Sequence, residues 1–133
     1  MTFTGVAHVA ITVEDLARSK SWYSRVLEWQ PVMEGEGDGV VFAVGALPGG
    51  TLIGLRQYEN GGPGQFDPTR IGLDHLALNA ESPDQLGEWE RRFVELGVSH
   101  DPTQQTPYGH VLNFKDPDGI ALEIYSAPAD NSE

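Results

Sequence analysis

Two histidines stand at matching places in two similar segments of the chain. The first segment reads GVAHVAITVE from Gly5 and the second reads GLDHLALNAE from Gly72, so His8 recurs 67 residues later as His75. Imidazole nitrogens bind divalent transition metals, and because the chain has no cysteine, a metal here would need nitrogen and oxygen ligands. The spacing therefore predicts two ligands of one metal site, provided that the fold brings both segments to one cavity.

Glu123 is the third candidate ligand. Side chains alternate between the two faces of a strand, so Leu122 and Ile124 would face a helix while Glu123 faces the other way. By the same alternation, His8 and His75 also face away from the helices. A buried carboxylate without a partner is costly. Two imidazoles with one carboxylate can hold Fe(II), Mn(II), Zn(II) or a similar ion and leave positions open for substrate.

The first half of the chain lacks a carboxylate at the position that matches Glu123. When Gly50 is aligned with Gly119, that position is Gly54, which would enlarge the cavity where a fourth ligand would otherwise stand. Arg56 lies on the same expected strand face and is either a binding group for an anionic part of the substrate or a solvated arginine at a strand edge. The other polar residues predicted to line the cavity are Asn79, Asn113, Tyr108 and Tyr125.

A structural role is the alternative for each histidine. A single histidine in a strand is more often a hydrogen-bonded structural residue than a metal ligand. The presence of His8 and His75 at equivalent places of a repeat, together with an inward glutamate, favours the metal site. His100 is expected in a loop and His110 at a strand end, where a structural or surface role is the simpler interpretation.

The first repeated segment is followed by a helical pattern. Glu14 or Asp15 can cap a helix whose apolar residues recur at helical spacing, and this helix is expected to end near Glu28. Two β-rich runs follow, over residues 40–45 and 51–57. The first half therefore predicts a strand, a helix and then further strands.

The second half repeats this order. Ser82 is predicted as an N-cap, with Pro83 at the first helical position and Gln85 completing a capping box, and Gly97 is expected to end the helix. The β-rich runs that follow cover residues 111–115 and 120–125. Each half thus corresponds to a βαβββ module, the first over 1–57 and the second over 71–126. A segment rich in Gly and Pro over 58–70 is expected to link them within a single domain, residues 1–133.

Composition limits the class of protein. With 133 residues, 39% hydrophobic and 21% charged, the chain is expected to form one soluble globular domain. Its formal charge of −12 disfavours nucleic acid and anionic lipid as partners. There is no apolar run of about 18 residues and no basic start before an apolar stretch, so no membrane association and a cytoplasmic location are expected.

Three motifs carry a resemblance to a known family: AHVAITVEDLARSKSWYSRVLEW at the start, GLDHLAL at the second half and FKDPDGIALEIY near the end. With these motifs the chain resembles the vicinal oxygen chelate superfamily, which includes glyoxalase I, bleomycin-resistance proteins, fosfomycin-inactivating transferases and extradiol dioxygenases. The resemblance implies an α+β, glyoxalase-like fold in which two paired βαβββ modules form curved sheets around a shared cavity. It implies His8, His75 and Glu123 as metal ligands. Family members pair their modules within one chain or across a dimer, and a homodimer is expected here.

The resemblance also implies a function. The expected protein is an enzyme that depends on one divalent ion (Fe, Mn, Zn or Ni), and the oxygens of its small-molecule substrate chelate this ion. The expected reaction is that of a lyase or isomerase, a dioxygenase or a transferase. In glyoxalase I the fourth ligand is a glutamate that takes part in proton transfer, and Gly54 stands in its place here. A site with three ligands is instead similar to the metal sites of extradiol dioxygenases and fosfomycin transferases. The alternative is a metal-free protein that sequesters an antibiotic or toxin, as in the bleomycin-resistance branch. The sequence assigns no further catalytic residue.

Overall fold

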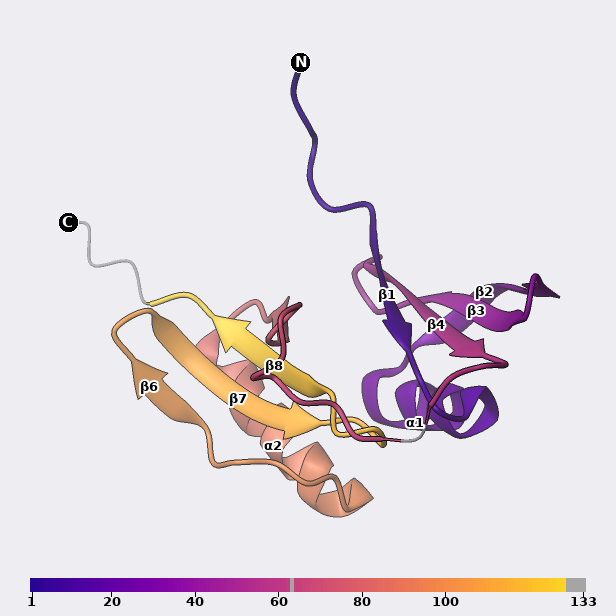
Figure 1. The fold of residues 1–133 in the computed structure, drawn as a ribbon. Helices are drawn as coiled ribbons and strands as arrows, with labels where there is room; N and C mark the ends of the chain where they lie inside the picture. The colour runs from indigo at the N-terminus through magenta and orange to yellow at the C-terminus, as the bar shows by residue number, and fades with distance from the viewer. Residues whose placement is uncertain (63, 129–133) are drawn as a thin grey trace. The chain divides into compact units, whose positions relative to one another are not determined.

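The computed structural model describes residues 1–62 and 64–128. The chain divides into two compact units, with the boundary between Gly64 and Gln65, inside the segment 58–70 that the sequence predicts as a linker. Each unit contains a four-stranded sheet and one helix, which packs on one face of that sheet (Figure 1). The α+β class and the βαβββ order of elements are confirmed in both units.

The first unit holds five elements. In chain order they are β1 (His8–Thr12), α1 (Leu16–Leu27), β2 (Gln30–Gly37), β3 (Val40–Ala46) and β4 (Leu52–Tyr58). The strands lie in the order β1-β4-β3-β2, with β1 parallel to β4 and the other pairs antiparallel. The parallel pair follows from the helical crossover, because a strand that returns beside β1 after a helix and a hairpin can run in the same direction.

The second unit repeats this topology. Its elements are β5 (Leu76–Asn79), α2 (Pro83–Leu96), β6 (Gln104–Thr106), β7 (Gly109–Lys115) and β8 (Ala121–Ser126). The strand order is β5-β8-β7-β6, with β5 parallel to β8. The two repeated segments are therefore edge strands of two separate sheets, and each lies beside the last strand of its own unit.

The helix-facing sides of the sheets form the cores, as the alternation predicts. In the first unit, Ile53 and Leu55 of β4 are fully buried with Tyr23 and Val26 of α1. The equivalent residues of the second unit are also buried: Leu86 and Phe93 of α2, Leu112 and Phe114 of β7, and Leu122 and Ile124 of β8. Burial of these apolar faces leaves the opposite face of each sheet for the histidines and the glutamate.

Trp29 completes the first core. Its indole is 1% exposed, and its Nε1 donates a hydrogen bond to the carbonyl oxygen of Ile53 at 3.0 Å. A Cβ at Gly45 would overlap this ring, so only a glycine at that position of β3 lets the indole lie flat against the sheet. The Trp29 indole therefore occupies the space that a side chain at position 45 would need.

The two helices end in the same way but differ in length. Glu28 follows α1 in the left-handed region with φ 57°, and Gly97 follows α2 in the same region with φ 70°. Helix α1 has 12 residues and α2 has 14. This difference of two residues explains why the repeat has an offset of 67 before the helices and 69 after them.

The predicted helix starts are only partly confirmed. Asp15 is the N-cap of α1, and its carboxylate accepts a hydrogen bond from the backbone N–H of Arg18 at 3.1 Å. Pro83 is the first residue of α2, but the expected capping box is wrong. The Ser82 side chain makes no capping hydrogen bond, and the Gln85 backbone N–H donates to the Ser82 carbonyl oxygen at 3.1 Å instead. The Gln85 side chain accepts from the backbone N–H of Glu81 at 3.1 Å rather than from that of Ser82.

The sequence patterns did not locate β2 and β6. Nearly all of β2 is exposed, so it shows no apolar alternation, and β6 has only three residues. The available signal was the Asp38-Gly39 pair, whose φ angles of 54° and 75° form a tight hairpin turn between β2 and β3. The first strands are also shorter than the repeated segments, since β1 begins at His8 and β5 begins one residue after His75.

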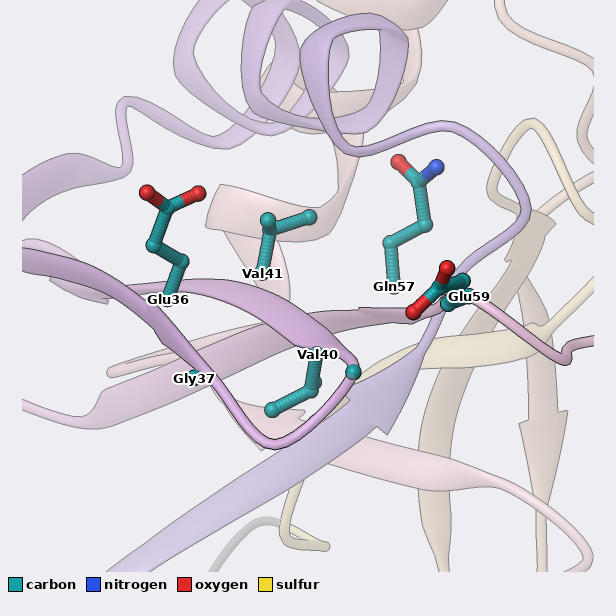
Figure 2. Close-up of a pocket in the computed structure, with 7 residues that line it drawn as sticks. Glu36, Gly37, Val40, Val41, Gln57 and Glu59 are labelled. Atoms are coloured by element: carbon teal, nitrogen blue, oxygen red, sulfur yellow. The ribbon is translucent and has the colours of Figure 1, made fainter.

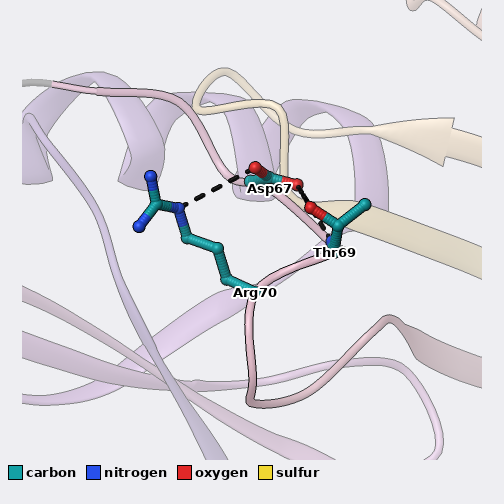
Figure 3. A network of polar contacts seen from close by, with 3 residues as sticks. All are labelled: Asp67, Thr69 and Arg70. Carbon is teal, nitrogen blue, oxygen red and sulfur yellow. Dashed lines mark hydrogen bonds and ion pairs between the residues drawn. The ribbon is translucent and has the colours of Figure 1, made fainter.

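Side-chain hydrogen bonds order the segment that leads into β5. Asp67 Oδ1 accepts from the backbone N–H of Thr69 at 2.9 Å and from its hydroxyl at 2.6 Å, and Arg70 Nε lies 3.8 Å from Asp67 Oδ2 (Figure 3). The hydroxyl of Thr69, followed by its backbone N–H, lowers the pKa of Asp67 below its ordinary value of 3.8. The ionised carboxylate of Asp67 therefore orders this loop.

No helix among the described residues is both long enough and apolar enough to cross a membrane.

Candidate metal centre

The second unit brings two of the predicted ligands together. His75 directly precedes β5, and Glu123 lies in the middle of β8, the parallel neighbour of β5. Their side chains meet on the face away from α2, where His75 Nε2 lies 3.3 Å from Glu123 Oε2. The Glu123 side chain is only 13% exposed, whereas that of His75 is 48% exposed. A nearly buried carboxylate thus has an imidazole nitrogen as its neighbour.

A second carboxylate contacts the other ring nitrogen of His75. His75 Nδ1 lies 2.8 Å from Asp74 Oδ1, within hydrogen-bond distance. A carboxylate at one ring nitrogen fixes the tautomer and the ring orientation of a metal-binding histidine. Asp74 was not among the site residues predicted from the sequence, although it directly precedes His75. The first copy of the segment has Ala7 at this place, so His8 has no such neighbour in its own sequence.

The charges around His75 fit a cation. A neutral imidazole carries one N–H, so when Nδ1–H donates to Asp74, Nε2 presents a lone pair to the Glu123 carboxylate. Two facing acceptors repel one another unless a positive charge, either a bound cation or a second proton on the ring, stabilises them. Two ligand atoms bound to one tetrahedral Zn(II) at about 2.0–2.2 Å lie about 3.3–3.6 Å apart, and the observed separation of 3.3 Å agrees with this. The donor set and its spacing therefore fit a divalent ion.

A hollow of about 500 Å³ adjoins the His75–Glu123 pair. Asn113, one of the predicted substrate-binding residues, lies directly opposite Glu123 on β7 and lines this hollow. Asp101 and Lys115 line it too, although neither was predicted from the sequence. The Asp101 backbone N–H donates to the Asn113 carbonyl oxygen at 2.9 Å. The hollow thus offers amide, ammonium and carboxylate groups beside the candidate ligands.

The other predicted residues of this unit lie further along the same strands. Tyr125 follows Glu123 on the same face, and Asn79 of β5 is its register partner. The Tyr125 hydroxyl donates to the carbonyl oxygen of Tyr108 at 2.6 Å, while the Tyr108 side chain itself is 80% exposed. Tyr125 therefore ties the β6–β7 turn to β8.

The third predicted ligand lies in the first unit. His8 is the first residue of β1 and is exposed on the face away from α1, with Ala10 and Thr12 on the same side. Gly54 pairs with Ala10, and Arg56 pairs with Thr12. Within residues 1–62 and 64–128, no group of three or more histidine, aspartate or glutamate side chains is gathered closely enough to hold a metal. His8 as the third ligand stays a prediction.

The two remaining histidines have structural surroundings. His100 Nδ1 lies 2.9 Å from the Val98 carbonyl oxygen, and its ring lies 5.8 Å from that of Phe93. His110 pairs with Ser126 at the end of the β7–β8 ladder. His100 thus lies in a loop and His110 near a strand end, as expected, although His110 Nδ1 is buried without a hydrogen-bond partner among the described residues.

A second hollow, of about 630 Å³, lies in the first unit near the ends of β2, β3 and β4. Figure 2 shows Glu36 and Glu59 well apart on its rim, with Val40 and Val41 between them. Gln57 is already engaged, since its Oε1 accepts from the backbone N–H of Leu16 at 2.7 Å. This hollow has no imidazole, so it is a poorer candidate for a transition-metal site than the His75–Glu123 pair.

Comparison with known proteins decides the family. Residues 5–124 match the model of the Glyoxalase/Bleomycin resistance protein/Dioxygenase superfamily. The chain belongs to this superfamily. The resemblance inferred from the three motifs and the expected glyoxalase-like fold are both confirmed.

Solved structures share the fold of this superfamily member. A glyoxylase/bleomycin resistance protein/dioxygenase domain from Frankia sp. EAN1pec is 43% identical, with 98% of this chain and 96% of that chain covered and a TM-score of 0.91. A mutant of the fosfomycin resistance protein FosX from Listeria monocytogenes, complexed with Mn(II) and 1S,2S-dihydroxypropylphosphonic acid, is 15% identical, with coverages of 96% and 94% and a TM-score of 0.72. The uncharacterized protein YwkD of Bacillus subtilis is 29% identical over 129 residues, which are 94% of this chain and 98% of YwkD.

Proposed function

We propose that this chain is a metal-dependent enzyme that acts on a small molecule bearing one or two metal-binding oxygens. His75 and Glu123, with His8 as the third ligand, would hold one divalent ion of Fe, Mn, Zn or Ni. The observation that carries the proposal is the 3.3 Å approach of His75 Nε2 to Glu123 Oε2, with Asp74 at the other ring nitrogen. The Mn(II) complex of the FosX mutant supports it, because that protein has the same fold.

Individual residues around the proposed metal site would have separate roles. An ion held there would supply Lewis-acid stabilisation of charge on the substrate oxygens, or redox chemistry if it is iron. Asp74 would keep the His75 ring oriented with its Nε2 lone pair toward the ion. Asn113 and Lys115 would donate hydrogen bonds to substrate in the hollow beside Glu123. Lyase or isomerase, dioxygenase and transferase reactions all suit such a site.

The glycine at position 54 argues against lactoylglutathione lyase activity. In glyoxalase I the matching glutamate takes part in proton transfer, and no carboxylate replaces it in β4, whose sequence is LIGLRQY. The expected homodimer and the expected cytoplasmic location stay predictions.

Metal content tests the proposal. The full chain, purified without a histidine tag, would be analysed by elemental mass spectrometry as isolated and after loading with Fe(II), Mn(II), Zn(II) or Ni(II). We expect about one ion per chain in the wild type and loss of that ion in Glu123→Gln and His75→Ala. Glu95→Gln is the matched control, because Glu95 is an exposed carboxylate on α2 and its removal should leave the metal content unchanged.

Circular dichroism of each variant separates loss of metal from loss of fold. Wild-type protein that stays free of metal after loading would overturn the proposal and favour the metal-free sequestering protein. Metal retained at full occupancy in a folded Glu123→Gln variant would remove Glu123 from the ligand set.

A further inference from the structure

Arg56 carries a second binding feature, on the sheet of the first unit. It lies on the face of β4 opposite the buried Ile53 and Leu55, beside Thr12 of β1 and Phe42 of β3. Its Cζ lies 5.6 Å from the ring centroid of Phe42 and 5.6 Å from that of Tyr58. We infer that this guanidinium, held between Phe42 and Tyr58, binds an oxyanion of the ligand, either a carboxylate or a phosphonate.

The guanidinium is oriented before any ligand arrives. Arg56 Nε donates to the Tyr58 hydroxyl oxygen at 3.0 Å, which uses one of its five N–H groups. The two aromatic rings restrict the plane of the group through cation–π contacts. An arginine already held in one geometry loses less rotational freedom on binding than a free one.

The remaining donors have no partner in their own unit. Among the described residues of the first unit, the terminal nitrogens of Arg56 make neither a hydrogen bond nor an ion pair. This is notable in a chain that has 20 acidic and only 8 basic residues, since a carboxylate partner would be easy to supply. The two Nη groups form the fork that matches two oxygens of a carboxylate or phosphonate.

Gly35 makes the aromatic half of this site possible. It is the register partner of Phe42 on β2, and a Cβ at Gly35 would lie 2.8 Å from the Cζ atom of the Phe42 ring. The ring therefore lies over the backbone of Gly35, where any larger residue would displace it. The position of the ring beside Arg56 thus depends on a glycine on the neighbouring strand.

The sheet surface between Arg56 and His8, which forms the floor of this site, suits a small ligand. Ala10 and Gly54 pair with one another between Arg56 at one end and His8 at the other, so no long side chain rises between the two. Residues two apart along a strand are about 6.6 Å apart, which gives a floor roughly 13 Å long from His8 to Thr12. A ligand could place its oxyanion at Arg56 and its other oxygens toward His8; this last step rests on the proposed function, whereas the oxyanion site itself does not.

The test uses the full chain freed of metal with a chelator. The Arg56 Nε–H signal and the backbone amide signals of Thr12 and Gly54, which every variant retains, would be followed by NMR while inorganic phosphate, methylphosphonate or acetate is added. We expect saturable shifts of these signals in the wild type, and dissociation constants from the amide signals about tenfold higher or more in Arg56→Gln, because a bidentate charge-assisted contact is lost. Arg91→Gln, an equal change of charge at an exposed position on α2, should bind as the wild type does. Tyr58→Phe should weaken binding less than Arg56→Gln does.

Each outcome has a clear meaning. Stronger binding of methylphosphonate than of acetate identifies a phosphonate ligand, and the reverse order identifies a carboxylate. An Arg56 signal that does not move, or equal binding by wild type and Arg56→Gln, overturns the inference. If Arg56→Gln does not fold, Arg56→Lys retains the charge without the fork and should still bind several-fold more weakly. The titration uses metal-free protein, so its result does not depend on whether the proposed metal site exists. In the separate elemental analysis, Arg56→Gln should contain as much metal as the wild type.

Discussion

The Nε2 atom of His75 lies 3.3 Å from Oε2 of Glu123, although a whole helix and three strands separate these residues in the chain. The parallel pairing of β5 with β8 produces this contact, since it sets Ala77 opposite Glu123 and brings the residues just before β5 to the same level of the sheet. A shift of one residue in this pairing would turn Glu123 toward α2 and abolish the contact.

Asp74→Asn tests how His75 is oriented. The amide has the shape of the carboxylate but lacks its charge, so it should hold Nδ1–H less firmly. We expect Mn(II) affinity, measured by electron paramagnetic resonance titration, to fall by about 10–100-fold, as is usual when the outer partner of a metal-bound histidine is removed. The melting temperature should barely change, because the Asp74 side chain is 72% exposed. Equal affinity in Asp74→Asn and in the exposed control Glu95→Gln would contradict the proposed role.

Gly45→Ala tests the packing of Trp29. The new methyl group would overlap the indole ring, which is 1% exposed and has no free space to enter. We expect the free energy of unfolding in urea to fall by about 1–3 kcal/mol, the usual cost of overpacking a core.

Gly54→Ala is the matched control for this change. Its new Cβ would meet Ala10 Cβ at 3.7 Å and Val44 Cγ2 at 3.8 Å, which are ordinary contacts. The free energy of unfolding should change by less than about 1 kcal/mol. Equal losses in the two variants would mean that the indole does not lie against Gly45.

Asp116→Ala tests the turn that leads into β8. Asp116 is 6% exposed, and its Oδ1 accepts from the backbone N–H of Asp118 at 2.8 Å and of Ile120 at 2.9 Å. Alanine leaves both donors without this acceptor, so we expect a loss of about 2–5 kcal/mol in the free energy of unfolding. Faster hydrogen exchange at the Ile120 amide should accompany it. Asp116→Asn retains an acceptor oxygen and should lose less; an equally large loss would show that the charge, not the acceptor, matters.

Thr69→Ala tests the pKa of Asp67. The Thr69 hydroxyl is the largest cause of the lowered value, so its removal should raise the pKa of Asp67 toward 3.8 in a carbon-13 NMR titration. Because the folded pKa is lowered, the contribution of the carboxylate to loop order is present above pH 3.8 and is lost as the pH falls through the folded pKa. Arg70→Gln should leave the titration nearly unchanged, and an equal shift in that variant would assign the effect to Arg70 instead.

Local patterns predicted much of the fold. The alternation around Leu122 and Ile124 correctly assigned the buried face of β8, and the glycine at position 97 correctly marked the end of α2. Both signals act over a few residues, so they can be read without knowledge of tertiary contacts. The strands β2 and β6 were not located because nearly all of β2 is exposed and β6 has only three residues, so burial imposes no readable pattern on their side chains.

The sequence by itself determined the repeat, the two βαβββ modules, the buried faces and the residue types from which a metal site can be built. Only the tertiary structure decided which atoms meet: that Glu123 lies beside His75, that Asp74 contacts the second ring nitrogen, and that Phe42 and Tyr58 contact Arg56. The reason is physical. Periodicity depends on backbone geometry within one element, whereas these contacts depend on strand register and side-chain rotamers, which long-range packing sets.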